Sequence, residues 1–410
     1  MPLKTPEKLK DQALSELKRY NLRMQIIRLL YKKSPQSAVQ LSKKLAISLP
    51  STRSMLNELI DEEVVLIKGT GESSGGRKPV LYSLNGEAFH ILAVEMDQYN
   101  AQAVILNCLN EPCSEIFQFD SNIDDPEFIS KLDQAFNRLE TSSGIRKTQV
   151  NAIGIGMPGL IDPRTGVNQT IKNPARRSIA QQVEKHFKLS TYIENDARMQ
   201  TLGEFVFGQA KNSQNTLVIN WSWGLGLGMI INGEIFAGSN GCSGEFSHIR
   251  VVEDGELCEC GKRGCLQTIT GAQHLLDLAK QAIANKEISQ LTNDFQHRPD
   301  ELTVKAVIAS ALKGDELSIN LISQLGKNMA WGLSILIQLY NPELILLSGP
   351  LSAPKQYLLP TIQQALHQYC LENILSNVKI EISALAEHSG LKGTGVMVFK
   401  KLFSTQQANR

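Results

Sequence analysis

Two short segments of the chain, SGEFSH at residues 243–248 and CECGKRGCLQ at residues 258–267, decide how the rest of it is interpreted. Together they hold four metal-binding side chains in the spacing His-x9-Cys-x-Cys-x4-Cys: His248, Cys258, Cys260 and Cys265. Three thiolates and one imidazole are donors that tetrahedral Zn²⁺ prefers, and the intervening glycines allow the loop to fold back on the ion. A core histidine is the alternative for His248 alone, but it leaves the cysteine spacing unexplained. The sequence therefore predicts a structural zinc site.

Length and composition are those of a globular protein with several domains. The chain has 410 residues, of which 42% are hydrophobic and 20% charged. Its longest apolar runs, such as residues 344–347, are far shorter than the roughly 20 residues that a bilayer span requires. Residues 1–20 are charged and do not resemble a secretion signal, so clustered cysteines indicate metal before disulfide. We expect a cytoplasmic protein that is not inserted in a membrane.

The amino-terminal part of the chain is basic and has the pattern of a winged helix-turn-helix. Residues 1–85 carry 15 Lys/Arg and 8 Asp/Glu, a net charge of +7, whereas the remainder carries −6. Helical spacing from Asn21 to about Lys33 is followed by a capping box at Ser37, and Pro50 suits the first turn of a third helix. Two β-type runs then flank a glycine-rich tip. These features predict a winged helix over residues 1–86.

A basic winged helix predicts binding to operator DNA. The third helix would enter the major groove, with Ser51, Thr52 and Arg53 near its start contacting base edges or phosphates. Arg77 and Lys78 at the tip of the wing would enter the minor groove or bind phosphate. A winged helix used only for protein contacts is the alternative, and the basic tip favours DNA.

Beyond residue 86, β-rich runs alternate with helical stretches, which is typical of an α/β fold. Glycines at 224, 226 and 228 alternate along a strand and indicate close approach of the backbone to another group, for which phosphate is one candidate. The order of the motifs resembles that of the ROK family of repressors, open reading frames and sugar kinases, above all its N-acetylglucosamine- and xylose-repressor type. The shared motifs are the winged helix, GIGMPG at 154–159, ENDA at 194–197, the glycine strand, the two segments quoted above and NPELILLSG at 341–349.

The resemblance covers essentially the whole chain and implies its architecture. Fold class α/β is expected: a winged helix followed by a two-lobed, actin-like ATPase domain of the ribonuclease H-like, sugar-kinase type. The division would be a DNA-binding domain over 1–86, a small lobe over 87–200 completed by about 385–410, and a large lobe over 201–384. The large lobe would carry the zinc loop and an oligomerisation surface, and a sugar would bind between the lobes.

The resemblance also implies which residues contact the sugar. They are Gly159, Asn195, Asp196, Glu245, His248 and Gln267. Asp196 occupies the general-base position of the kinases, although a helix cap is the alternative for it, and Gly159 equally fits a simple turn. The Glu245 carboxylate suits sugar hydroxyls, and His248 can bind zinc through one ring nitrogen while presenting the other to the sugar.

The chain departs from the family's kinases at their phosphate-binding loops. The stretch after the first strand is EMDQYN at 95–100, without a glycine that would let the backbone wrap a phosphate. The second loop reads SWG at 222–224, with the Trp223 indole where the γ-phosphate would lie, and the adenosine-side glycine pair reads SGP at 348–350. Gln267 replaces a sugar-contacting glutamate and adds an N–H donor. Since positioning and electrostatics supply most of the catalysis of phosphoryl transfer, we expect neither ATP binding nor enzymatic activity.

The sequence thus favours a sugar-responsive DNA-binding transcriptional regulator of the repressor type. Its effector would be a monosaccharide or a sugar phosphate, and a homodimer or dimer of dimers would bind a two-fold-symmetric operator. One alternative is a ROK-type sugar kinase that phosphorylates a hexose or amino sugar. Another is a scaffold whose zinc loop only holds an oligomer together. The identity of the sugar, the operator sequence and the sign of regulation stay open.

Overall fold

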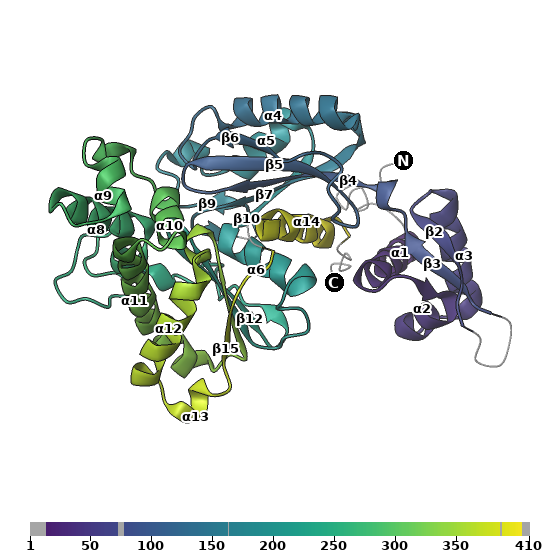
Figure 1. Ribbon diagram of the computed structural model, residues 1–410. Coiled ribbons are helices and arrows are strands. Elements are labelled where there is room, and N and C mark those ends of the chain that lie inside the picture. Colours follow the sequence, from purple (N-terminus) through teal and green to yellow (C-terminus); the bar gives the residue numbers. More distant parts are fainter. Residues whose placement is uncertain (1–13, 73–77, 163, 386–387, 404–410) are drawn as a thin grey trace. The chain divides into compact units, whose positions relative to one another are not determined.

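The computed structural model describes residues 14–72, 78–162, 164–385 and 388–403 (Figure 1). The chain forms two compact units. The first contains Met1–Ile155, Ser178–Ile193 and Thr394–Arg410, and the second contains Gly156–Arg177 and Glu194–Gly393. The chain therefore passes repeatedly between the units, and the lobe boundaries given above stay a prediction.

The second and third helices of the winged helix begin where the sequence supplies caps. The helices of this module are α1 (Leu14–Lys32), α2 (Ala38–Leu45) and α3 (Leu49–Asp61). The capping box at Ser37 is confirmed, because the Ser37 hydroxyl accepts the Gln40 N–H and the Gln40 side chain accepts the Ser37 N–H. Pro50 lies in the first turn of α3, as predicted. Helix α1 begins at Leu14, seven residues before the predicted Asn21, and Tyr20, the residue before Asn21, also packs against the core of the module.

The wing is an antiparallel pair, β2 (Val65–Thr70) and β3 (Val80–Leu84), which confirms the predicted strands. A third strand, β1 (Gln36–Ser37), pairs with β3 and was not predicted, because two residues are too few to show an alternating pattern. Lys78 lies exposed beside β3. Arg77 lies outside the described residues.

The first unit also contains most of a five-stranded sheet of order β10-β7-β4-β5-β6. Its strands are β4 (His90–Met96), β5 (Asn100–Asn107), β6 (Phe117–Asp120), β7 (Val150–Met157) and β10 (Ser190–Asn195), and its helices are α4 (Phe128–Ser143) and α5 (Ile179–Phe187). Helix α14 (Ser389–Leu402) begins in the second unit and ends in the first. Near its end, Phe399 stacks on Tyr31 of α1 with ring centroids 3.8 Å apart. The winged helix thereby shares its core with the end of α14.

The second unit is built on a sheet of order β13-β12-β11-β14-β15, in which β11 pairs antiparallel with β12 and parallel with β14. Its strands are β8 (Ile161–Asp162), β9 (Val167–Asn168), β11 (Thr216–Trp221), β12 (Leu225–Ile231), β13 (Glu234–Ile235), β14 (Leu344–Ser348) and β15 (Lys379–Ile382). Its helices are α6 (Asp196–Phe207), α7 (Gln267–Thr270), α8 (Ala272–Ala284), α9 (Gln290–Phe295), α10 (Val304–Leu312), α11 (Glu316–Tyr340), α12 (Lys355–Tyr369) and α13 (Glu372–Leu375). The main core lies between one face of this sheet and helices α7 to α13.

The glycine strand, β12, brings the backbone close to helix α6. A Cβ at Gly226 would lie 2.8 Å from the Ala197 Cβ, and one at Gly228 would collide with the Thr201 side chain. Alternation every second residue correctly indicated a close approach on one face of the strand. The neighbour on that face is the start of α6, which places Asn195 and Asp196 against the sheet. Among the described residues, no helix combines the length and apolarity needed to cross a bilayer.

Candidate functional site

The four predicted zinc ligands come together in the second unit. The ligand atoms of His248, Cys258, Cys260 and Cys265 all lie within 4.8 Å of one another. The Cys260 and Cys265 Sγ atoms are 3.6 Å apart, and the Cys258 Sγ is 3.6 Å from the His248 Nδ1. Ligands on one tetrahedral zinc ion are separated by about 3.8 Å for two thiolates and about 3.6 Å for a thiolate and an imidazole nitrogen. The donor set and its spacing therefore fit zinc.

Backbone pairing and core packing hold this cluster in place. The Cys258 N–H donates to the Lys262 carbonyl oxygen at 2.7 Å, and the Leu266 N–H donates to the Ile249 carbonyl oxygen at 2.9 Å. Leu266 is completely buried, so it anchors the end of the loop in the core. Burial raises the pKa of the Cys265 thiol to about 12, with the neighbouring thiols adding to the rise. A cation is what would stabilise a thiolate there, and its binding would release protons.

His248 has two differently directed ring nitrogens. Its Nδ1 faces Cys258, and its Nε2 lies 3.9 Å from the Glu245 Oε2. Glu245 caps and His248 ends one short 3₁₀ turn, η5 (Phe246–His248), which the buried Phe246 side chain fixes in the core. Burial raises the pKa of the Glu245 carboxyl, while His248 and Arg198 act in the opposite direction. A metal on Nδ1 would thus orient the imidazole whose other nitrogen faces this carboxylate.

The cap of α6 is Asn195 and not Asp196. The Asn195 side chain accepts the Arg198 N–H at 3.2 Å and donates to the Gly159 carbonyl oxygen at 3.2 Å. Asp196 is the first residue of α6, where the helix dipole favours a carboxylate. Gly159 has φ +119°, and a Cβ there would lie 2.5 Å from the Asn168 Oδ1, so the turn requires glycine. One polar network thus joins the loop at Gly159 to the start of α6.

Arg198 is a buried charged residue of this region that the sequence did not single out. Its guanidinium is buried, pairs with the Glu194 carboxylate and donates to the Gly241 carbonyl oxygen at 2.6 Å. It thereby connects β10 and α6 to the segment that leads to Glu245. The i, i+4 spacing of Glu194 and Arg198 was the available signal, but the contact with Gly241 is long-range in sequence.

Gln267 is held inside the zinc loop. Its Nε2 donates to the Glu259 Oε1 at 2.8 Å, so the amide N–H that replaces the family's carboxylate has an acidic partner. A Cβ at Gly224 would lie 4.0 Å from the Gln267 Oε1, which places the β11–β12 turn beside it. The Trp223 side chain on that turn packs against the large core. Contact of these residues with a sugar stays a prediction.

In the turn that follows β4, the Asp97 carboxylate binds backbone N–H groups of the same turn. The Asp97 Oδ1 accepts the N–H groups of Tyr99 and Asn100, each at 2.7 Å, and the Asp97 N–H donates to the Asn100 carbonyl oxygen at 2.8 Å. Backbone N–H groups of this kind are the donors with which glycine-rich loops bind phosphate. Here two of them already have a carboxylate as partner.

Comparison with known proteins places the chain in a family. The sequence pattern described as ROK family matches residues 127–401, more than half of the chain. The chain belongs to the ROK family. A second pattern, winged helix-turn-helix DNA-binding, matches residues 21–65.

Similar proteins include both regulators and a kinase of this type. The xylose repressor of Caldicellulosiruptor bescii is 28% identical over 90% of this chain and 92% of its own length. A glucokinase of Halalkalibacterium halodurans is 31% identical over 65% of this chain and 82% of its own length. A crystal structure of a ROK family transcriptional regulator, a homologue of the Escherichia coli MLC protein, has 25% identity and a TM-score of 0.79. The match covers 94% of this chain and 97% of that one, which supports a ROK regulator architecture.

Residues predicted at the start of the DNA-reading helix differ in exposure. Ser51 and Arg53 are exposed on α3. Thr52 is completely buried, and its hydroxyl donates at 3.0 Å to a backbone carbonyl one turn earlier. The prediction that Thr52 contacts DNA is therefore wrong, because its side chain lies on the same inward stripe as Leu56 and Leu59.

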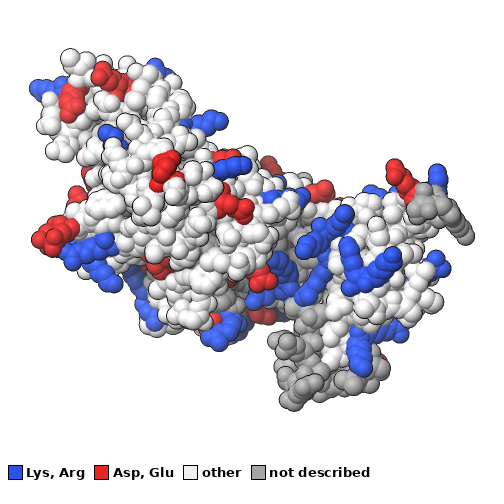
Figure 2. Space-filling view, turned by 90° about the horizontal axis from the view of Figure 1, so that it is seen from below, with Lys and Arg blue, Asp and Glu red and all other residues white. Residues whose placement is uncertain are grey.

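Helix α1 neutralises carboxylates around α3. Arg19 Nη2 lies 2.6 Å from the Glu58 Oε1, and Arg23 pairs with Glu62. Exposed ion pairs of this kind stabilise a fold little, but they offset the repulsion between acidic side chains and DNA phosphates. Figure 2 shows lysine and arginine side chains spread over the winged helix. The described part of this module therefore has a surface suited to a polyanion.

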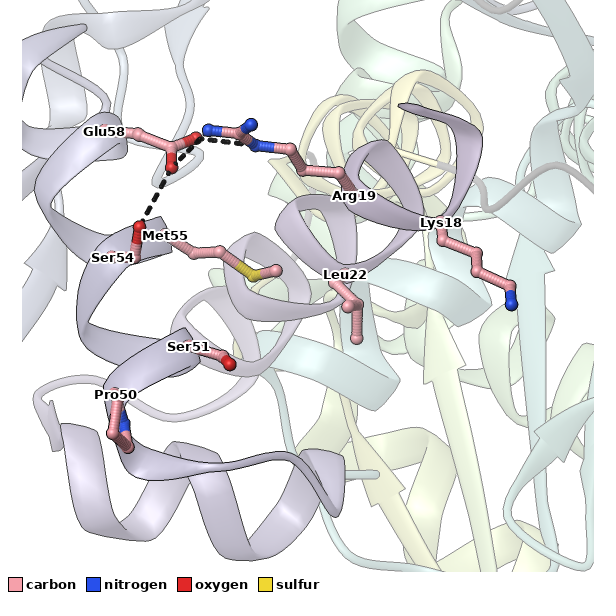
Figure 3. A pocket seen from close by; sticks show the side chains of 8 residues that line it. All are labelled: Lys18, Arg19, Leu22, Pro50, Ser51, Ser54, Met55 and Glu58. Atoms are coloured by element: carbon pink, nitrogen blue, oxygen red, sulfur yellow. Dashed lines mark hydrogen bonds and ion pairs between the residues drawn. The ribbon is translucent and has the colours of Figure 1, made fainter. Parts of the chain in front are cut away.

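A groove of about 610 Å³ lies between α1 and α3 (Figure 3). Leu22 and Met55 form its apolar part, and Ser51 and Ser54 lie along α3. Its lining residues all come from the winged helix: Lys18, Arg19, Leu22, Pro50, Ser51, Ser54, Met55 and Glu58. The groove is thus part of the face that presents Ser51, and it is separate in the chain from the sugar-site residues.

Proposed function

We propose that this ROK protein is a sugar-responsive transcriptional regulator of the repressor type. Its winged helix would bind operator DNA, and its kinase-like domain would bind a monosaccharide or sugar phosphate without phosphorylating it. The similarity to a xylose repressor over 90% of the chain, winged helix included, supports this function. A homodimer on a two-fold-symmetric operator is the assembly we expect.

The observation that carries the non-enzymatic part is the Asp97 turn. A carboxylate that accepts two backbone N–H groups at 2.7 Å removes the donors a phosphate would need, and its own charge repels a triphosphate. Orientation and charge stabilisation of the phosphates supply most of the catalysis of phosphoryl transfer. Without them, Asp196 would serve as a sugar ligand rather than as a general base.

The metal would act through His248. Zinc held by His248 and the three cysteines would fix the imidazole, and through it the side on which Glu245 binds sugar hydroxyls. When bound, the ion supplies a structural crosslink and takes no part in a reaction. Glu245, Asp196 and the α6 cap at Asn195 would then form the polar side of the sugar site, supported by the buried Arg198.

Helix α14 is the element we expect to carry the signal. Its first part packs against α6, since a Cβ at Gly393 would collide with the Met199 backbone. Its last part stacks Phe399 on Tyr31 of the winged helix. A packed helix that touches both the sugar-site helix and the DNA-binding module can transmit a displacement of one to the other.

Fluorescence anisotropy with the chain's own upstream DNA tests the function. We expect binding that exceeds binding to random DNA at physiological salt, and a change in affinity with at least one member of a panel of free and phosphorylated sugars. A lack of sequence preference would reject the regulator. A scaffold would show no shift of melting temperature with sugar, whereas a sensor shows one that Glu245→Ala removes.

A sugar kinase is the second candidate, favoured by the carboxylate of Asp196 at the start of α6 and by the 31% identity to a glucokinase. ADP release over a panel of hexoses and amino sugars distinguishes it. Turnover that Asp196→Asn abolishes would establish the kinase and overturn our preference.

A further inference from the structure

A second group of metal-binding side chains lies in the first unit, where neither the sugar site nor the zinc loop extends. Glu87, His90 and Cys113 each offer one ligand atom, and these atoms lie within 4.8 Å of one another. Glu87 belongs to the 3₁₀ turn η2 (Gly86–Ala88), and His90 begins β4. Cys113 follows β5, the antiparallel partner of β4, and its N–H donates to the carbonyl oxygen of Ile105 at 2.8 Å.

The imidazole of His90 is buried and lacks a hydrogen-bond partner for one nitrogen. The residue is 5% exposed, and its Nε2 has no hydrogen bond. The Glu87 Oε2 lies 3.2 Å from this nitrogen, yet the two are not aligned for a hydrogen bond. An unsatisfied buried polar atom is costly, so it calls for a ligand.

The side chains next to the His90 Nε2 are of kinds that bind a cation, a carboxylate and a thiol. Among the described residues, the Glu87 carboxylate pairs with His90 and with no lysine or arginine. Two ligands on one tetrahedral zinc ion, an imidazole nitrogen and a carboxylate oxygen, lie about 3.4 Å apart. The observed 3.2 Å matches this separation, which also explains why the two groups face each other without a hydrogen bond.

We propose that Glu87, His90 and Cys113 form a second metal site, which binds one divalent transition-metal ion such as Zn²⁺. Carboxylate, imidazole and thiolate are all zinc ligands, and three protein ligands leave a fourth position for water. The buried imidazole gives the site a fixed point, and the exposed Glu87 carboxylate closes it from the solvent side.

The position of the site gives the ion a structural consequence. Residues just before Glu87 connect the wing to the sheet: the Asn85 side chain donates to the Glu63 carbonyl oxygen at 2.7 Å, and the Asn85 carbonyl oxygen accepts the Cys108 thiol at 3.0 Å. A metal that joins Glu87 to Cys113 would add a crosslink at this connection. The site is independent of the proposed sugar response.

Metal titration of the full-length protein tests the proposal. The chain, first loaded with one equivalent of Zn²⁺, is titrated with Co²⁺ and followed by thiolate-to-cobalt absorption and by metal analysis after dialysis. We expect a second equivalent to bind, with the absorption of one thiolate rather than three. Binding that stops at one equivalent would overturn the site.

Variants assign the second equivalent to these residues. Glu87→Gln changes a side chain that is 71% exposed, so it is expected to fold, and it should weaken the second ion at least about tenfold. Cys113→Ser should weaken it similarly and remove the thiolate absorption. Cys370→Ser, a thiol elsewhere in the chain, is the matched control and should change neither. A second ion that keeps its affinity in both Glu87→Gln and Cys113→Ser would refute the assignment.

Discussion

The zinc loop and the turn after β4 arrange their polar groups in opposite ways. In the zinc loop, the thiols of Cys258, Cys260 and Cys265 converge with the His248 imidazole at the spacing of ligands around a tetrahedral cation. Between Asp97 and Asn100, backbone N–H groups converge on the chain's own carboxylate. The first arrangement is compatible with a bound cation, which would stabilise its buried sulfur atoms as thiolates, whereas the second is already satisfied. This difference between the two loops agrees with the proposed function as a sugar sensor.

The largest effect should come from removing a zinc ligand. Cys265→Ser replaces a completely buried thiol, so it should abolish zinc binding and lower the free energy of unfolding by about 3 kcal/mol or more. Cys242→Ser, outside the ligand set, should leave both unchanged. Metal analysis and thermal denaturation measure the two quantities. If Cys265→Ser retained one equivalent of zinc and wild-type stability, the contrast between the two loops would disappear.

The second largest effect should come from changing Glu245, which we expect to bind the sugar. Its hydrogen bonds to hydroxyls would involve a charged group, so Glu245→Gln should weaken sugar binding by about 10- to 100-fold, measured by calorimetry. Glu259→Gln is the control within the zinc loop, and it should have a smaller effect because Glu259 is held by Gln267. Equal losses in the two variants would contradict the assignment of Glu245 as the principal sugar ligand.

The pH dependence of sugar binding follows from the same carboxyl. Burial raises the pKa of Glu245, and only the ionised form accepts two hydroxyl protons. The affinity for sugar should be highest above this raised pKa and should decrease as the pH falls through it. The decrease should occur at a higher pH than it would for a glutamate with an ordinary pKa. Titrations at several pH values should show this step in wild type and not in Glu245→Gln. A step that persists in the variant would identify another titrating group.

Helix α3 also contains both kinds of polar side chain, one that is hydrogen-bonded within the protein and one that is exposed to solvent. Arg53 is exposed, whereas the hydroxyl of its neighbour Thr52 is used by the backbone. Arg53→Ala should therefore weaken operator binding by about tenfold and reduce the salt dependence by about one ion. Arg138→Ala, which removes a positive charge from α4, is the control for net charge. Equal weakening in both variants, measured by anisotropy at several salt concentrations, would show that Arg53 makes no specific contact.

Local patterns predicted much of this molecule, and long-range packing explains what they missed. The capping box at Ser37 and the grouping of the four predicted zinc ligands depend on spacing within a short segment, so the sequence specifies them directly. The inward position of Thr52 could also have been predicted from the sequence, because Thr52 lies four residues before Leu56 on the same helical stripe. By contrast, a periodicity of two marks one face of the glycine strand without revealing which element packs on it.

Contacts between distant segments explain why Arg198 was missed and why the bond between Asn195 and Gly159, two residues predicted separately, was not foreseen. Arg198 reaches Gly241, and Asn195 reaches Gly159, through hydrogen bonds that no local pattern encodes. The Asp97 turn lies between these cases. The absence of glycine was visible in the sequence, whereas the hydrogen bonds of the Asp97 carboxylate to two backbone N–H groups are apparent only from the structure.

The smallest effect should come from the Asp97 turn itself, and it tests whether that turn can be reopened. Asp97→Ala removes the acceptor for two exposed N–H groups, so it should lower stability by about 1 kcal/mol. Asn173→Ala is a matched control, because the Asn173 side chain likewise accepts a loop N–H, at 3.1 Å, in the second unit. We expect no ATP turnover in either variant, because the turn still lacks the glycine that a phosphate loop needs. ADP release from Asp97→Ala in the presence of sugar would show that the carboxylate alone blocks the nucleotide, and that the rest of the kinase site is intact.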